Sequence, residues 1–402
     1  MPCAGCSWRS TRPCRRACEV EPRGPPAAPR GRPRHRGGRG ADSLAQASLK
    51  LTGPAGAPWA SLFVAMVVGL PLFFETGLVL LLPIVVAAAA TLPHSSNPDA
   101  ARLQLMLPAL TGLSVVHALV PPHPGPLLAV NALGANMGRT MLYGILVAIP
   151  TAIIAGPLLA FFTSRDVRLV APVIERHDLT VAAPPKASSL CVILMPVVLI
   201  AAGELRGLLP PWTASRLGWL SAVSHPVPAL LLTNLVALPL LFGRKLRNPQ
   251  VQDTIWTETM KSAGAILLSI GAGGALKQVL VSAGLSNLLA KLASAQAISP
   301  LLLGWLVAVA IRLATGSATV ATITTVGVMS GVVTATGIAP EWVVLAIGAG
   351  SVFFSHVNDP GFWLVKSYLG TSTPDTFRTW SILETVISVV GLVAVLCASA
   401  VL

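Results

Sequence analysis

Charged residues are scarce in this chain of 402 residues: Asp, Glu, Lys and Arg make up 11% of it, against about 25% in soluble proteins. Apolar residues make up 53%, so there is too little polar surface to cover a water-soluble globule. Long uncharged runs recur along the chain, which is the pattern of helices that cross a lipid bilayer. This composition excludes a soluble enzyme and predicts an all-α polytopic membrane protein.

Motifs for two kinds of enzyme are missing. The sequence has no G-x4-G-K-[ST] phosphate loop, and the glycine-rich segment 271–274 is not followed by Lys-Ser or Lys-Thr. It also has no H-E-x-x-H pair, and prolines flank His123, which prevents a helical ligand face there. We therefore expect no enzyme, no cofactor and no metal. A membrane metalloenzyme using the histidines and Asp359 is a disfavoured alternative.

The net charge of +13 is concentrated near the start of the chain, where residues 1–57 hold 11 Lys or Arg against 3 Asp or Glu. This segment is rich in Arg, Pro and Gly and has no apolar periodicity, so it is predicted to be a disordered tail preceding a transmembrane domain at 58–402. A basic tail of this kind is no nucleic-acid-binding domain, and no nucleic acid is expected as a partner. It also lacks the apolar core of a secretory signal.

Six cysteines are present, and four of them lie in the tail. These four, Cys3, Cys6, Cys14 and Cys18, could in principle supply thiolates to zinc, but no His and no strand pattern surround them. Unpaired thiols are the favoured interpretation. The other two cysteines, at 191 and 397, lie in apolar runs and are predicted to be small buried residues.

The intervals between charged residues outline nine or ten membrane elements, because a charge at the bilayer centre costs several kcal/mol. The predicted elements are 59–92, 103–120, 140–162, 189–203, 226–242, 261–283, 299–316, 317–337, 341–356 and 380–402. As one helix, the first would be about 51 Å long, against a bilayer core of about 30 Å. Gly69, Pro71 and Gly77 interrupt it. We predict a broken or re-entrant helix there, and a cytoplasmic position for the cationic loop 163–189.

The first candidate site is the segment 114–126, in which four prolines and a glycine surround His117 and His123. Prolines open a helix and leave carbonyl and amide groups without helical partners. Such backbone is tolerated at membrane depth only inside the protein or beside a water-filled cavity. A capped helix end followed by an external turn is the alternative.

The second candidate site begins at Arg312, the one charged residue between Lys291 and Glu341. A guanidinium in such apolar sequence needs an anion, and a substrate carboxylate would supply one. The hydroxyls of Ser317 and Thr319, at a predicted helix start, would add donors at the positive end of the helix dipole. For the threonines at 322, 324 and 325, close helix packing is the alternative.

The third candidate site is the polar segment 355–363 between two apolar runs. Ionisable residues within a membrane are functional by default, so Asp359 or His356 is predicted to bind and release a coupling proton. An interfacial loop is the alternative. Together the three segments predict two residue sets. Substrate binding is assigned to Arg312, Thr315, Ser317, Thr319, Asn358 and His123, and proton coupling to Asp359, His356, Glu75 and His117.

These segments also form an approximate repeat. Ser114-Val115 precedes Pro124-Gly125 much as Ser351-Val352 precedes Pro360-Gly361. Two halves, about 59–242 and 259–402, would each contain a broken element followed by a Pro-Gly break. This pattern predicts an inverted-repeat secondary transporter whose site lies between the halves.

Four stretches also resemble the gluconate permease family of bacterial proton symporters. They are residues 120–126 (VPPHPGP), 271–281 (GAGGALKQVLV), 312–321 (RLATGSATVA) and 354–363 (FSHVNDPGFW), and the likeness runs from about 59 to 402. It implies a multi-pass carrier of the ion-transporter superfamily in the bacterial inner membrane. Gluconate or a related sugar acid would move with a proton, and a homo-oligomer is possible. Relatives that carry D-serine leave a D-serine-type substrate open.

The chain departs from that family at its start. Members begin with about three further apolar spans where this chain has the basic tail, so the first repeat is expected to be incomplete. The composition of the tail is typical of a segment included by a misassigned translation start. A non-transporting remnant is therefore a further alternative.

Overall fold

The computed structural model describes residues 53, 56–70, 74–75, 77–78, 81–82, 85, 97–169, 186–206, 217–294 and 298–401. The four tail cysteines lie outside these residues, and so does most of the cationic loop 163–189. The predictions of a disordered tail and of its thiols therefore concern residues that the structure does not describe.

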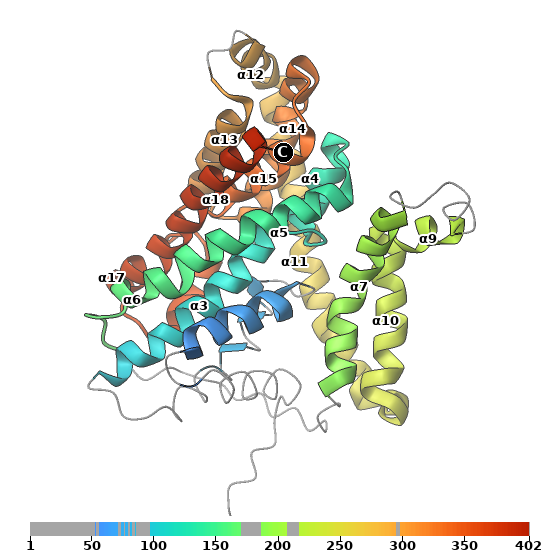
Figure 1. The fold of residues 1–402 in the computed structure, drawn as a ribbon, viewed down its shortest axis with the longest axis vertical. Coiled ribbons are helices and arrows are strands. Elements are labelled where there is room, and N and C mark those ends of the chain that lie inside the picture. Colours follow the sequence, from blue (N-terminus) through green and yellow to red (C-terminus); the bar gives the residue numbers. More distant parts are fainter. Residues whose placement is uncertain are drawn as a thin grey trace, which may run out of the picture. The chain divides into compact units, whose positions relative to one another are not determined.

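The described residues form helices joined by short turns, with no β-strand among them, which confirms the all-α prediction. In chain order the elements are Gly56–Gly69, α3 (Pro98–Leu119), α4 (Pro124–Leu133), α5 (Met137–Ile153), η1 (Ile154–Leu158), α6 (Leu159–Thr163), α7 (Lys186–Arg206), α9 (Gly218–Val223), α10 (Pro226–Phe242), η2 (Gly243–Arg247), α11 (Pro249–Ser282), α12 (Leu285–Ser294), α13 (Pro300–Thr315), α14 (Ala318–Thr336), α15 (Pro340–Ser351), α16 (Pro360–Leu369), α17 (Thr373–Thr376), η3 (Phe377–Ser381) and α18 (Ile382–Val401). Figure 1 shows their arrangement.

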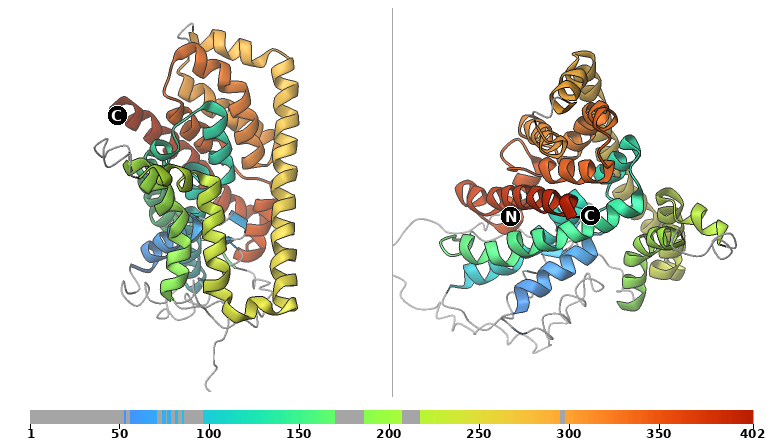
Figure 2. Two further views of the ribbon diagram at one scale, coloured as in Figure 1. Left: turned by 90° about the vertical axis from the view of Figure 1, so that its right-hand side faces the viewer. Right: turned by 45° about the horizontal axis from the view of Figure 1, so that its top comes forward.

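Five helical stretches in the described part of the chain are long and apolar enough to cross a membrane, and two shorter apolar helices accompany them. Among the described residues, fewer helices reach full spanning length than the nine or ten elements predicted. The reason is visible at α13 and α15, which have 16 and 12 residues because the chain breaks where each ends. In contrast, α11 continues for 34 residues, about 51 Å, and appears as one long rod in Figure 2.

The predicted break in the first span is present. The helix Gly56–Gly69 ends in a turn at Leu70, and helical backbone resumes at Phe74 and Glu75. The predicted break after α3 is present as well: α3 ends at Leu119, and α4 starts at Pro124. Prolines at these positions remove backbone donors, so neither segment can continue as a regular helix.

A structural repeat accompanies the sequence repeat. α4 and α16 both have ten residues and start with a proline, and both end before a glycine in the left-handed conformation, with φ of 66° at Gly134 and 68° at Gly370. The next helix is capped by Asn136 in the first case and by Ser372 in the second. The helix start, the left-handed glycine and the following cap of the first segment each recur in the second segment, and the offset along the chain is the same for all three. The inverted relation between the halves remains a prediction.

The core is centred on α3 and α15, and every residue of α15 from Glu341 to Ser351 is buried. Two glycines let other helices approach the end of α3. A Cβ at Gly348 would lie 2.2 Å from the Ala118 carbonyl oxygen, and one at Gly144 would lie 2.3 Å from that of Leu119. α5 also packs beside α18, as Figure 1 shows. These contacts hold the break after α3 against the second half of the chain.

The prediction that Cys191 and Cys397 are buried is wrong, because both are exposed. In a water-soluble protein an apolar run marks the core. In a membrane protein the surface facing lipid is as apolar as the core, so the run alone does not distinguish them.

Candidate functional site

The site forms where two helix breaks meet. α13 ends at Thr315, Gly316 adopts φ 72°, and the Ser317 side chain caps α14 by accepting a hydrogen bond from the Val320 amide at 3.3 Å. On the other side, α15 ends before a turn that leads to Asp359. The sequence therefore places a cap at the start of each following helix, and both caps face the break.

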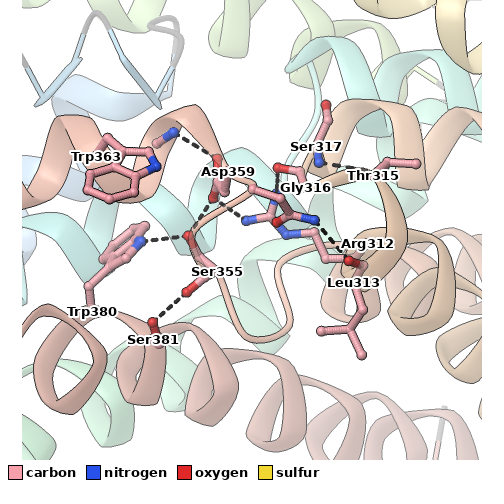
Figure 3. A network of polar contacts seen from close by, with 12 residues as sticks. Arg312, Leu313, Thr315, Gly316, Ser317, Ser355, Asp359, Trp363, Trp380 and Ser381 are labelled. Carbon is pink, nitrogen blue, oxygen red and sulfur yellow. Dashed lines mark hydrogen bonds and ion pairs between the residues drawn. The ribbon is translucent and has the colours of Figure 1, made fainter. Parts of the chain in front are cut away.

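An ion pair joins the two breaks. The Arg312 guanidinium lies 2.5 Å from Oδ2 of Asp359 and also donates to the carbonyl of Gly316 (Figure 3). Arg312 is 4% exposed and Asp359 is 9% exposed. The anion that Arg312 needs is therefore present within the protein. Because the two charges belong to different breaks, the pair fixes the end of α13 against the start of α16.

Three donors hold the Asp359 carboxylate. Oδ2 accepts from Arg312 and from the Ser355 hydroxyl (Figure 3). Oδ1 accepts from the Gly361 amide at 2.7 Å. The Ser355 hydroxyl in turn accepts from Nε1 of Trp380 at 2.8 Å. Each of these three groups contacts the carboxylate as a hydrogen-bond donor.

The backbones of the two breaks lie very close together. A Cβ at Gly316 would lie 2.3 Å from the Asn358 carbonyl oxygen. The Asn358 side chain donates to the carbonyl of Leu313 at 2.9 Å. Asn358 therefore satisfies one of the carbonyls that the end of α13 leaves without a helical partner.

Beside the ion pair lies a cavity of about 700 Å³, within the range of about 300–1,000 Å³ that small-molecule sites occupy. Eight of the ten predicted site residues line it: Arg312, Thr315, Ser317, Thr319, Asn358, Asp359, Glu75 and His117. They come from α3, α13, α14, the turn before α16 and the helical residues at 74–75. Residues distant in sequence thus share one hollow.

The other two predicted site residues, His123 and His356, are not among the lining residues. His123 is buried beside the cavity, where its Nε2 lies 2.9 Å from the Gly69 carbonyl oxygen, and its ring lies 5.2 Å from that of His117. This contact links the break after α3 to the break after Gly69. The ring of His356 contacts that of Phe354 instead, at 5.9 Å between centroids.

Among the lining residues that sequence reasoning missed are Lys261, Trp380 and Glu384. Glu384 is 2% exposed and is the one acidic residue of α18. A lone carboxyl in an apolar helix is a signal that the sequence does contain. Trp380 shows no such signal, because a tryptophan near a helix end is also typical of the membrane interface.

Among the described residues, no group of three or more His, Cys, Asp or Glu side chains is placed to hold a metal ion. The cavity instead carries two cations, Arg312 and Lys261, together with the carboxyls of Glu75, Asp359 and Glu384. Hydroxyl and amide groups of the two breaks complete its polar lining. Such a lining is suited to a small anion that also carries hydroxyl groups.

Broken apolar helices around a charged internal cavity define the chain as a membrane transporter. The chain matches the family described as GntP family permease over residues 35–401. It is 42% identical over 371 residues to a gluconate permease of Pseudomonas aeruginosa, covering 90% of this chain and 81% of the relative. It is also 39% identical to a high-affinity gluconate transporter and 38% identical to a Gnt-II system L-idonate transporter, both of Escherichia coli. These two matches cover 89% and 90% of this chain and 81% and 82% of the relatives. The chain belongs to the GntP permease family.

Proposed function

We propose that this protein takes up gluconate or a closely related sugar acid across the inner membrane by proton symport. Relatives that carry the names gluconate permease and L-idonate transporter support this substrate class. Both acids combine one carboxylate with several hydroxyl groups. The cavity offers two cations together with hydroxyl and amide groups, which suits that combination.

Arg312 is the proposed anchor for the substrate carboxylate. A guanidinium has five N–H donors, and that of Arg312 donates to Asp359 and to the Gly316 carbonyl. The remaining donors, held in a fixed orientation by those contacts, can bind a carboxylate in the cavity. Side chains from the same two breaks, those of Thr315, Thr319 and Asn358, would bind the substrate hydroxyls.

The start of α14 strengthens anion binding. Its first amides belong to Ala318 and Thr319, which line the cavity with the capping residue Ser317. The first amides of a helix lack helical acceptors and carry the positive end of the helix dipole. An anion bound there gains hydrogen bonds that do not depend on the rotamer of a long side chain.

Alternating access is the proposed mode of transport. The cavity is lined by segments from both halves of the repeat, including Ser114 and His117 from α3 and Arg312 from α13. Relative movement of the two halves around this hollow would open it to one side of the membrane and then to the other. The observation that carries the proposal is the buried Arg312–Asp359 pair at the wall of the cavity.

The test is uptake of labelled gluconate into proteoliposomes that contain the purified protein. With an imposed pH gradient, alkaline inside, we expect accumulation above the external concentration, and a protonophore should abolish it. Competition by unlabelled L-idonate but not by D-serine would define the substrate class. Uptake that proceeds equally with and without the gradient would contradict proton symport.

A further inference from the structure

Glu384 lines the same cavity as the Arg312–Asp359 pair. It belongs to the first turn of α18, an otherwise apolar helix, and it is 2% exposed. A buried carboxyl in such a helix is costly, so it requires either a partner or a function.

The contacts of Glu384 leave one oxygen open. Ser114 from α3 interacts with the carboxyl, but Oε1 is buried and has no hydrogen-bond partner among the described residues. Asp359 differs, because both of its oxygens accept hydrogen bonds from donors. Glu341 also differs: it is buried, and its Oε1 accepts from the Asn136 amide at 3.0 Å. Glu384 therefore has a vacant oxygen at which a proton can bind.

The charges around Glu384 are those of the cavity wall. Arg312 of α13 and Asp359 lie close enough to interact with the Glu384 carboxyl. His117 of α3, Glu75 and Lys261 of α11 line the same cavity. α5, α15 and η3 also pack against α18, and among their described residues none with a charged or titratable side chain lines the cavity.

The balance of these charges would couple binding of a proton to binding of an anion. With a proton on Glu384, the cations Lys261 and Arg312 balance the carboxylates of Glu75 and Asp359. Without that proton, the cavity carries one additional negative charge. A second anion near the buried Glu384 carboxylate is then repelled, because charges a few ångströms apart interact strongly away from bulk water. A sugar acid is therefore accepted when Glu384 is protonated.

We propose that Glu384 is the residue that carries the coupled proton, an inference that rests on the proposed function. The carboxylate takes up one proton at the outer side, and one sugar-acid anion binds near Arg312. After reorientation the anion leaves, and the proton dissociates from the Glu384 carboxyl to the inner side. One proton and one monovalent anion cross together, so the cycle moves no net charge. Because linkage is reciprocal, bound substrate also favours the protonated carboxyl.

The test compares E384Q with the wild type in three measurements on the full-length protein in proteoliposomes. Gln keeps the shape of a protonated Glu but cannot release a proton. We expect E384Q to lose accumulation driven by the pH gradient while exchange of internal for external labelled gluconate remains measurable. The pH dependence of gluconate affinity, expected to be about 5- to 150-fold across the titration in the wild type, should be absent in E384Q.

The matched control is E341Q, which alters a second buried carboxyl that lies outside the cavity and whose amide can still accept from Asn136. It should accumulate gluconate as the wild type does. A wild type that accumulates no gluconate would contradict the proposed function itself. Gradient-driven accumulation by E384Q would overturn the assignment of Glu384 alone.

Two further outcomes would contradict the assignment of the coupled proton to Glu384. If E384Q elutes as a monodisperse protein but has lost exchange as well as accumulation, its role is structural and the inference is wrong. If H117Q removes the pH dependence of affinity while E384Q keeps it, the proton belongs to His117, which lines the same cavity and whose buried Nδ1 has no hydrogen-bond partner among the described residues.

Discussion

The carbonyl oxygen of Asn358 lies so close to Gly316 that a β-carbon at position 316 would be only 2.3 Å from it. Gly316 also has a φ of 72°. Two breaks from different parts of the chain can therefore approach only because one of them ends in glycine, and this approach brings Arg312 to Asp359. The contact suggests a sharp test of the geometry.

Gly316→Ala should destabilise the protein and prevent gluconate binding. Alanine in the left-handed conformation costs about 1–2 kcal/mol, and the contact with Asn358 adds to that cost. Gly337→Ala is the matched control, because Gly337 has φ 63° but nothing within 4 Å of its added Cβ. The midpoint of thermal unfolding in detergent should fall further for the first variant. Equal shifts would show that the close approach is not important.

Arg312→Ala should abolish gluconate binding and also lower stability. From the sequence alone we expect loss of binding with little effect on the fold, but the buried pair changes that expectation. Removing one partner of a buried ion pair costs about 3–5 kcal/mol because the other charge is left unpaired. Binding isotherms and thermal unfolding would measure the two effects.

A double substitution, Arg312→Gln with Asp359→Asn, separates those effects. Neutralising both partners removes the unpaired charge, so the unfolding midpoint should rise above that of Arg312→Ala while binding stays absent. Arg139→Ala, at an exposed arginine outside the cavity, is the control for loss of a cation. Recovery of gluconate binding in the double variant would rule out Arg312 as the anchor.

Ser355→Ala should weaken the support of Asp359. Ser355 donates to the Asp359 carboxylate and accepts from Trp380, so its loss leaves a buried indole N–H unpaired at a cost of about 1–3 kcal/mol. Trp380→Phe removes that N–H and keeps a ring against Phe74, whose centroid lies 5.3 Å away. Unfolding of the single and double variants should be non-additive, with the double less destabilised than the sum. Simple additivity would exclude a shared network.

Lys261→Gln should reduce the affinity for gluconate without changing the fold. Lys261 lines the cavity, and its positive charge attracts the anion from a distance, an effect that salt screens. The loss of affinity should therefore be greater at low ionic strength than at high ionic strength. Lys291→Gln on α12, outside the cavity lining, should leave affinity unchanged at both. A loss that does not respond to salt would indicate a purely local contact.

The helix breaks could be predicted from the sequence because each depends on the chemistry of a few neighbouring residues. Gly69, the prolines before α4 and the Thr-Gly-Ser turn at 315–317 each interrupt a helix by a mechanism that needs no tertiary contact. Arg312 was also found, because a lone cation in a long apolar run is conspicuous. These signals predicted where polar groups would gather, and eight of the ten predicted site residues do line one cavity.

Other features depend on which segments meet in space. Asp359 lies 47 positions from Arg312, and its role as the partner of that arginine is invisible in a linear sequence. His123 and His356 lie in the expected segments yet do not line the cavity, because the direction of a side chain after a break depends on packing. The exposed cysteines at 191 and 397 were misjudged for a related reason, since apolar sequence is equally compatible with core and lipid.

That this chain is a helical membrane protein, where several of its helices break, and which family it resembles could all be predicted from its residues. Composition and helix-breaking residues act locally, so those conclusions require no knowledge of the fold. The folded arrangement was needed to show that Asp359 neutralises Arg312 and that one oxygen of Glu384, in the same cavity, has no hydrogen-bond partner among the described residues. Charges interact through space rather than along the chain, so only the folded arrangement determines which groups balance one another.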